Sequence, residues 1–288
     1  MEKQADFGSK VLQNPPEFDK IKGNHSDSGE IMNNKHDYIA VFDSGVGGIS
    51  VLRHLLKALP GERFVYFGDS ANAPYGSRPT EEVRGLTLAA VEKLLTEYPL
   101  KALVIACNTA TAAAVNDVRA AHPELIVVGI EPALKVAADH YPGGRVGVLA
   151  TEVTLREEKF DTLLHRFDED VTIYKIPAPG LVELVEAGKM DAPETEALLQ
   201  KVLKPYLGKL DAVVLGCTHY PFAKNAIRRV LGENVVLLDG GEGTARETRR
   251  RLELAGLLEN GSGEVILRNS SPDPDMLQLS RERLTQED

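Results

Sequence analysis

Short apolar runs alternate with longer amphipathic stretches along the chain from Tyr38 onward. A short apolar run rich in β-branched residues is typical of a buried strand, whereas apolar residues spaced three and four apart are typical of a helix. The first cycle predicts strands at Tyr38–Phe42, Phe64–Phe67, Leu103–Ala106 and Ile126–Ile130, and helices at Ile49–Leu59, at Thr80–Tyr98 and from Asn108 onward. Strands and helices that alternate in this way predict a parallel sheet covered by helices on both faces.

The same pattern returns after Arg145. The second cycle predicts strands at Val146–Leu149, Val171–Ile176, Ala212–Leu215 and Val235–Asp239, a helix to Phe167, further helices up to Leu207, a helix at Gly241–Leu258, and then a weak strand at Val265–Leu267 before a polar helix. Equivalent positions of the two cycles lie 107 to 110 residues apart, which is too long a period for a solenoid. We therefore predict an α/β protein whose two similar parallel-sheet domains are related by internal duplication.

The two cysteines of the chain occupy equivalent corners of the two cycles. Cys107 follows a predicted strand and precedes an Ala-rich helix, and Cys217 follows Ala212–Gly216 and precedes a second helical stretch. At such a corner we expect the sulfur to face free N–H groups of a helix start, which favour the thiolate over the thiol. Because ligands bind outside the carboxyl ends of parallel strands, two similar domains that face each other bring both cysteines to one cleft, the predicted active site.

Two like thiols across one cleft suit a reaction that needs a proton base on each face of a carbon atom. One thiolate removes a proton while the opposite thiol delivers one, so that a stereocentre inverts. Each sulfur then lies within about 3–3.5 Å of the reacting centre, and the two sulfurs lie about 6–7 Å apart, too far for a disulfide. The alternative is that both cysteines are buried and serve as small hydrophobic side chains. Their equivalent positions favour the catalytic interpretation.

Polar residues beside the cysteines and the first strand are candidates for substrate contacts. Asn108, Thr109, Thr218 and His219 place hydrogen-bonding groups at predicted helix starts, where carboxylates bind well. Asp43 ends the first strand, where it either relays a proton or caps the following helix.

Two loops at strand ends carry weaker signals. Pro74–Gly76 is a turn whose backbone groups can meet a ligand. Gly45–Gly48 resembles a phosphate-binding loop only loosely, because the Gly-Lys-Ser/Thr ending is missing, and we interpret its glycines as allowing close packing of strand against helix. The sequence has no zinc-ligand spacing, no serine elbow and no lysine context typical of pyridoxal phosphate, so we expect neither metal nor cofactor.

Composition narrows the class of protein further. The chain has 288 residues, 43% of them hydrophobic, and a formal net charge of −10, which disfavours nucleic acid and anionic membranes as partners. There is no apolar run long enough for a membrane span and no basic-then-apolar export signal, so we expect a cytoplasmic protein with reduced thiols. Residues 1–37 are polar, without apolar periodicity, and are expected to form a flexible N-terminal extension.

Four stretches of the chain resemble the glutamate racemase family, which belongs to the superfamily of cofactor-independent aspartate/glutamate racemases. They are Val41–Gly48, Pro74–Gly76, Ala106–Ala110 and Leu215–Pro221, and they stand in the family's order and spacing. The resemblance implies interconversion of L- and D-glutamate for peptidoglycan synthesis. It also implies a discontinuous first domain, made of residues 38–131 and 240–288, and a second domain of residues 132–239.

The same resemblance implies roles for individual residues. Cys107 would be the base that acts on D-glutamate, and Cys217 the base that acts on L-glutamate. Asp43, His219 and Glu186 would be accessory acid–base groups. The implied substrate contacts are Asp43, Ser44, Pro74, Tyr75, Gly76, Asn108, Thr109, Thr151, Thr154, Thr218 and His219.

The implied small-molecule partner is glutamate, and two further partners stay open. Some members of the family respond to a cell-wall precursor, which would act as an activator, and the chain could pair with a second copy as a homodimer. Two other functions also stay open. One is a racemase of aspartate or another acidic amino acid, and the other is a two-domain protein that binds an amino acid without reaction.

Overall fold

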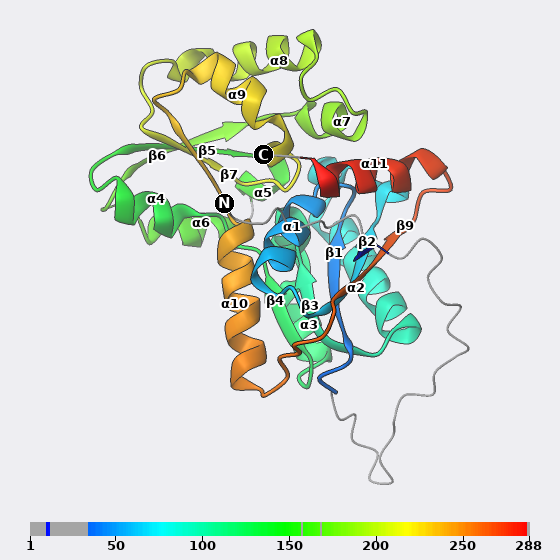
Figure 1. Ribbon diagram of the computed structural model, residues 1–288. Coiled ribbons are helices and arrows are strands. Elements are labelled where there is room, and N and C mark those ends of the chain that lie inside the picture. Colours follow the sequence, from blue (N-terminus) through cyan, green and yellow to red (C-terminus); the bar gives the residue numbers. More distant parts are fainter. Residues whose placement is uncertain (1–9, 12–33, 157, 168, 287–288) are drawn as a thin grey trace, which may run out of the picture.

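The computed structural model describes residues 10–11, 34–156, 158–167 and 169–286, and shows two parallel-sheet units packed against each other (Figure 1). The strands are β1 (Tyr38–Asp43), β2 (Arg63–Gly68), β3 (Leu100–Ile105), β4 (Ile126–Gly129), β5 (Arg145–Ala150), β6 (Thr172–Pro177), β7 (Ala212–Leu215), β8 (Val236–Asp239) and β9 (Glu264–Asn269). The α-helices are α1 (Ile49–Ala58), α2 (Thr80–Glu97), α3 (Asn108–Ala121), α4 (Leu134–His140), α5 (Glu152–Arg156), α6 (Glu158–His165), α7 (Leu181–Glu186), α8 (Pro193–Leu203), α9 (Lys224–Leu231), α10 (Gly241–Leu254) and α11 (Pro274–Thr285). Among the described residues, no helix combines the length and the apolar character needed to cross a membrane.

The first unit is built on a five-stranded parallel sheet with the order β4-β3-β1-β2-β9. Every residue of β1 and β3 is buried, because helices cover both faces of the sheet as the uninterrupted apolar runs predict. The carboxyl ends of β1 and β3 lie side by side, with Phe42 opposite Ile105 in the register. This pairing places the loops after the two strands next to each other at one edge of the sheet.

The second unit repeats the first. Its four-stranded sheet has the order β6-β5-β7-β8, which is the order β2-β1-β3-β4 with each strand replaced by its equivalent in the second cycle. All the pairings are parallel, and the predicted α/β fold with two similar sheets is confirmed. The strand β9 extends the first sheet alone.

The chain passes from one sheet to the other after β4 and returns after β8, and β9 then pairs with β2. On this basis we propose the division of the chain at 131/132 and 239/240, with residues 240–288 completing the first domain. In Figure 1, the long helix α10 runs beside the first sheet directly below the second unit.

The elements differ from the predicted ones mainly in short helices. The helix expected up to Phe167 consists of α5 and α6, and α4 was not predicted because its seven residues follow a proline-containing loop. No α-helix begins at Cys217: a 3₁₀ turn, Tyr220–Ala223, comes first, and α9 follows it. Pro221 lies inside this turn and lacks the N–H that an α-helix would use.

Two residues of the N-terminal extension, which was expected to be flexible, contact the first unit. Val11 forms an isolated parallel bridge with Val265 of β9, and the Nζ atom of Lys10 donates to the carbonyl of Pro60 at 2.7 Å. These contacts place residues 10–11 against the edge of the first sheet. Residues 1–9 and 12–33, which the prediction also covers, lie outside the described residues.

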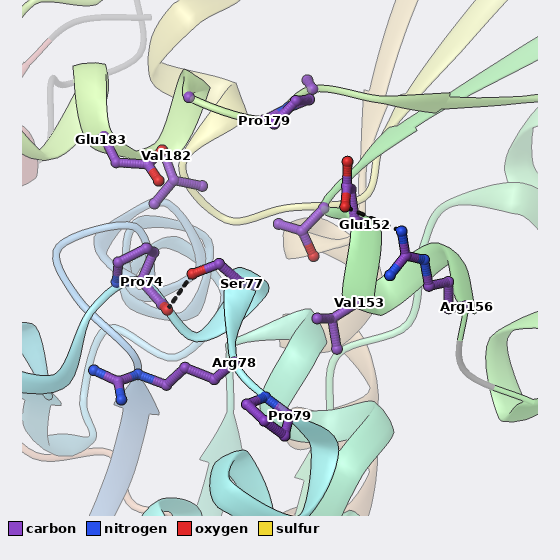
Figure 2. Close-up of a pocket in the computed structure, with 14 residues that line it drawn as sticks. Pro74, Ser77, Arg78, Pro79, Glu152, Val153, Arg156, Pro179, Val182 and Glu183 are labelled. Carbon is purple, nitrogen blue, oxygen red and sulfur yellow. Dashed lines mark hydrogen bonds and ion pairs between the residues drawn. The ribbon is translucent and has the colours of Figure 1, made fainter.

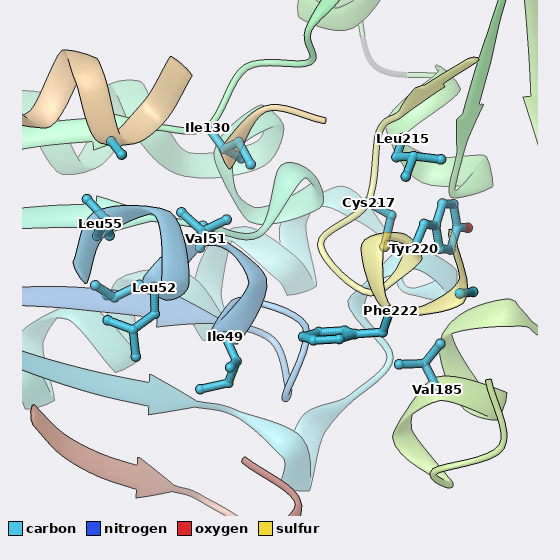
Figure 3. Packing of buried hydrophobic residues seen from close by; sticks show 14 of the residues in the cluster. Ile49, Val51, Leu52, Leu55, Ile130, Val185, Leu215, Cys217, Tyr220 and Phe222 are labelled. Carbon is cyan, nitrogen blue, oxygen red and sulfur yellow. The ribbon is translucent and has the colours of Figure 1, made fainter. Parts of the chain in front are cut away.

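One cluster of buried hydrophobic residues includes side chains of both units. Figure 3 shows Phe222 extending from the turn after Cys217 toward Ile49 of α1, with Val185 of α7 on its other side. Since all three side chains belong to this cluster, apolar burial fixes the Cys217 turn against the first unit.

A buried ion pair fastens three segments of the first unit at the end of the sheet opposite the cysteines. The side chains of Lys101 and Glu62 have no exposed surface, and their charged atoms lie 2.5 Å apart. Lys101 also donates to the carbonyls of Lys35 and Leu257, and Glu62 accepts from the backbone N–H of Glu259 at 2.8 Å. The pair therefore joins the start of the first unit to the segment that leads into β9.

We predict that Lys101→Met lowers the free energy of unfolding by about 3–5 kcal/mol, because it leaves the Glu62 carboxylate buried without a cation. Urea unfolding measures this loss. The double variant Lys101→Met/Glu62→Gln removes both charges, keeps an acceptor for Glu259, and should recover most of the stability. Equal stability of the single and double variants would contradict this account.

Candidate active site

Cys107 lies where β3 ends and α3 begins. Its Sγ accepts the N–H of Ala110 at 3.4 Å, so the sulfur caps the helix, and its thiol donates to the Ser44 hydroxyl at 3.5 Å. Ser44 follows β1, the neighbouring strand. Adjacent parallel strands thus bring the loop of residues 43–48 to the first cysteine.

The environment of Cys107 favours the thiol. Burial, and next the negative charge of Asp43, raise its pKa to about 12. The Ser44 hydroxyl, which turns to donate to a thiolate, and the Ala110 N–H act in the opposite direction. The expectation that the helix start favours the thiolate is therefore wrong in its net effect, because one weak N–H···S bond does not offset the burial of the sulfur. A charge on Cys217 also raises this pKa, so the two sulfurs lie within electrostatic reach of each other.

Cys217 has a different set of partners. Its Sγ lies 3.7 Å from Nδ1 of His219, and Nε2 of His219 lies 2.6 Å from Oε1 of Glu186 at the end of α7. Burial disfavours the imidazolium, but the hydrogen bonds with Cys217 and Glu186 outweigh it and raise the pKa of His219 well above its usual value. For Glu186, burial is again outweighed, and the bond from His219 lowers the carboxyl pKa. A charged His219–Glu186 pair therefore stands behind the second thiol.

Both acidic groups of the site are held by donors from the opposite unit. Oε1 of Glu186 accepts the N–H of Val46 at 2.8 Å, and Oδ2 of Asp43 accepts the Thr218 hydroxyl at 2.9 Å. Burial raises the pKa of Asp43 to about 6, and the nearby His219 and the bond from Thr218 limit the rise. Asp43 Oδ1 also accepts the N–H of Gly45 at 3.0 Å, which is a local turn and not the cap of a helix.

The glycines after β1 make room for these groups. A Cβ atom on Gly45 would lie 1.9 Å from Glu186 Oε1, and one on Gly47 would lie 2.4 Å from His219 Nδ1. Packing of strand against helix, the role expected for all of these glycines, fits Gly48, whose Cβ would lie 2.5 Å from the Cβ of Asp43. Gly45 and Gly47 instead admit the acid–base pair of the second unit.

Three predicted contact residues meet across the two units. The hydroxyl of Thr109, in the first turn of α3, lies 3.3 Å from that of Thr151 and 3.1 Å from that of Thr154, and the latter two are 2.9 Å apart. All three side chains are buried. Asn108 is also buried, and it lines a cavity of about 10 Å³ together with Cys217 and Thr218.

The turn Pro74–Gly76 stands at the mouth of this region. Figure 2 shows Pro74 and Ser77 on one side of a cavity of about 380 Å³, with α5 and the loop that leads into α7 on the other. Thr151 also lines this cavity, and a Cβ atom on Gly76 would lie 2.6 Å from Cγ2 of Thr151. The turn therefore contacts the second unit directly.

The structure thus gathers the predicted site residues along one seam between the units, and it adds three that the sequence did not single out. The hydroxyl of Ser50 donates to the carbonyl of Thr218 at 3.0 Å, and that of Tyr66 donates to the carbonyl of Gly45 at 2.5 Å. The third residue is Asp69, whose N–H donates to the carbonyl of Asp43 at 2.9 Å. Of the three, only Asp69 could have been identified from the sequence as a candidate site residue, because it follows the carboxyl end of a predicted strand, as Asp43 does.

Comparison with known proteins gives concordant matches. A family model described as Asp/Glu/Hydantoin racemase matches residues 39–248. The chain is 44% identical over 253 residues to a protein named glutamate racemase from Clostridium botulinum (strain Alaska E43 / Type E3), a match that covers 87% of this chain and 98% of the relative. The residues matched by the family model include both cysteines, Asp43, Glu186 and His219.

Solved structures agree with this. Glutamate racemase isoform RacE1 from Bacillus anthracis is similar with a TM-score of 0.79 and 33% identity, covering 87% of this chain and 94% of that one. Escherichia coli glutamate racemase, in complex with L-glutamate and the activator UDP-MurNAc-Ala, is similar with a TM-score of 0.74 and 32% identity, covering 86% and 92%.

We predict that Cys107 reacts slowly with iodoacetamide in the folded protein. A pKa of about 12 leaves about one thiol in 10⁴ as thiolate at about pH 8. In the Cys217→Ser variant, where Cys107 is the single cysteine, the rate should rise about tenfold per pH unit from about pH 8 to about pH 10, without a plateau. The same variant unfolded in urea should level off near the ordinary thiol pKa. A plateau in the folded protein within this range would contradict the burial argument.

Proposed function

Because the chain belongs to the Asp/Glu/hydantoin racemase family, we propose that it is a glutamate racemase, an isomerase that interconverts L- and D-glutamate by a two-base transfer of the α-proton. The observation that supports this most is the pair of buried cysteines at equivalent strand ends, each with its own acid–base partner. The relatives named glutamate racemase, matched over nearly their whole length, support glutamate as the substrate.

In the direction from L- to D-glutamate, Cys217 takes the α-proton and Cys107 delivers one to the opposite face. The raised pKa of Cys107 suits the delivering role, because the side chain waits as a thiol. On the other side, the Glu186 carboxylate keeps the His219 imidazole charged, and Nδ1 of this ring lies 3.7 Å from the sulfur of Cys217.

In the reverse direction Cys107 must first lose its proton. Asp43 is the accessory group proposed to accept it, with a pKa of about 6 and a carboxylate near enough to affect the thiol. Bound glutamate brings its α-ammonium, and a positive charge near Cys107 lowers the pKa of the thiol. Substrate binding would thus convert a resting thiol into an accessible base.

The substrate carboxylates would be held by neutral donors. The hydroxyls of Thr109, Thr151 and Thr154 bond to one another here, and a carboxylate between them would replace these contacts by stronger, charge-assisted ones. With Ser44, Asn108, Thr218 and the Pro74–Gly76 turn, they would complete the proposed binding site. The developing carbanion would be stabilised by such oriented donors and by prompt protonation from the far side.

The biological setting is part of the same proposal. D-glutamate made here would supply peptidoglycan synthesis in the cytoplasm. The structure of the Escherichia coli relative contains an activator, UDP-MurNAc-Ala. On this basis we propose that a cell-wall precursor of the same kind activates this chain. We also propose, from the resemblance to the family, that two copies of the chain form a homodimer.

We predict that L-glutamate incubated with the purified protein in D₂O yields D-glutamate deuterated at the α-carbon, without any added cofactor. Chiral chromatography with mass detection measures product and label, and a parallel arm with UDP-MurNAc-Ala measures activation. Aspartate should react far more slowly. Faster turnover of aspartate would instead favour the aspartate reading, and binding without exchange would favour a non-catalytic protein.

We predict that Cys107→Ser and Cys217→Ser each lower racemisation in both directions by about 10²-fold or more, since each direction needs one thiolate and one thiol. A glutamate analogue with a leaving group at Cβ needs abstraction alone. Cys107→Ser should keep elimination from the L-analogue and lose it from the D-analogue.

Cys217→Ser should give the mirror result, so each variant serves as the matched control of the other. Both should unfold at the wild-type urea midpoint. Equal loss for both analogues in both variants would overturn the assignment of one base to each face.

A further inference from the structure

Asp69 lies beside Asp43 where β2 and β1 end, one position beyond the residue of β2 that faces Asp43 in the register. It follows Gly68 at the carboxyl end of the strand, and its N–H donates to the carbonyl of Asp43 at 2.9 Å. The end of β2 is therefore fastened to the end of the strand that carries the catalytic carboxyl group. Its side chain is buried, with 5% of the residue exposed.

Neutral groups of the next loop satisfy the Asp69 carboxylate. Oδ2 accepts the hydroxyl of Tyr75 at 2.7 Å, and the side-chain amide of Asn72 donates to Oδ1 at 3.1 Å and to Oδ2 at 3.0 Å. Arg78 donates to the carbonyl of Asn72 at 2.8 Å, which ties the far end of the loop to the same point. A buried carboxylate is costly without donors, so these bonds fix the loop strongly.

The Tyr75 hydroxyl uses its proton in the hydrogen bond to Asp69. Burial, and next the hydrogen bond and the charge of Asp69, raise the pKa of Tyr75, so the side chain stays a neutral phenol. Cys107 and Asp43 raise it further, which places the ring beside the acid–base groups. A phenol whose proton already serves Asp69 is a poor proton donor to the reaction. What this turn can offer the substrate is its backbone.

The turn must also be placed accurately. Gly76 contacts Thr151 so closely that a Cβ atom there would lie 2.6 Å from Cγ2 of that residue. The Tyr75 ring is buried against Phe42, with ring centroids 6.4 Å apart, and this packing fixes the ring plane. The hydrogen bond to Asp69 then fixes how deeply the ring, and hence the turn, sits in the first unit.

We propose that Asp69 is a positioning residue of the site: it holds the Tyr75 hydroxyl, and so sets the backbone of the Pro74–Gly76 turn to receive the substrate. This inference rests on the proposed racemase function. Asp69 acts through Tyr75 and does not itself transfer a proton. Asp69 and Tyr75 form one functional unit, and the loss of either has the same consequence for glutamate binding.

The test compares Asp69→Ala, Tyr75→Phe and the double variant in the racemase assay. Each single variant should raise KM for both enantiomers about tenfold while kcat stays within about threefold and its pH profile is unchanged. The double variant should be no worse than the worse single variant, because both remove the same hydrogen bond. Asp69→Asn keeps an acceptor for the phenol and should restore KM most of the way.

Tyr98→Phe is the matched control. This buried tyrosine of the same unit accepts a hydrogen bond from Arg268 at 2.9 Å and precedes β3, at the end of the sheet opposite the cysteines. It should lower the unfolding midpoint as Tyr75→Phe does, yet leave KM unchanged. A Tyr75→Phe variant that loses kcat by about 10²-fold with an altered pH profile would overturn the proposal, because the phenol would then transfer a proton.

Additive effects in the double variant, or lower stability with unchanged KM, would overturn it as well. An inactive wild type would count against the proposed function, whereas these results in an active wild-type background count against the role of Asp69 alone.

Discussion

Two carboxylates at the seam between the units, Asp43 fully buried and Glu186 with 14% of its side chain exposed, are the constraint on which this structure depends. Among the described residues, Asp43 and Glu186 form no ion pair with a lysine or arginine, and a buried carboxylate is stable only where donors reach it. Each has one donor from its own unit, the Gly45 N–H for Asp43 and His219 for Glu186. The other donor comes from the opposite unit: the Thr218 hydroxyl reaches Asp43, and the Val46 N–H reaches Glu186. Satisfying each charge therefore fixes how the two units face each other. The absence of side chains at Gly45 and Gly47 is the steric condition for this contact.

The duplicated backbone provides two similar corners, but their electrostatics differ. Cys107 faces Ser44 and the negative charge of Asp43, and its pKa is raised to about 12. Cys217 faces His219, which the Glu186 carboxylate keeps charged. Under the proposed mechanism, this difference gives each sulfur its own partner for the proton that it takes or delivers. Geometry that is shared by the two halves then serves a reaction that needs one base and one acid at a time.

Much of this was accessible from the sequence. The succession of strands and helices along the chain, the duplication and the position of Cys107 follow from apolar runs and from a polar residue at a strand end, which are local patterns. The pKa of Cys107 was not accessible, because it depends on burial and on the charge of Asp43, which residues distant in sequence provide. The packing roles of Gly45 and Gly47 were missed for the same reason. Pro221, in contrast, is a local signal for the 3₁₀ turn after Cys217, and it was outweighed by the analogy with Cys107.

The raised pKa of Cys107 connects catalysis with the chemical stability of the site. A thiolate is the form that oxidises and alkylates, so a cysteine that rests as a thiol is protected while the site is empty. The same burial would stop the reaction if it could not be reversed. Under the proposed mechanism, the α-ammonium of the bound amino acid is the charge that reverses it, since a nearby cation favours ionisation of the thiol. On this argument the substrate itself activates the base, and a site built from neutral donors needs no permanent cation beside Cys107. On the other side of the site, beside Cys217, the permanent positive charge is that of His219.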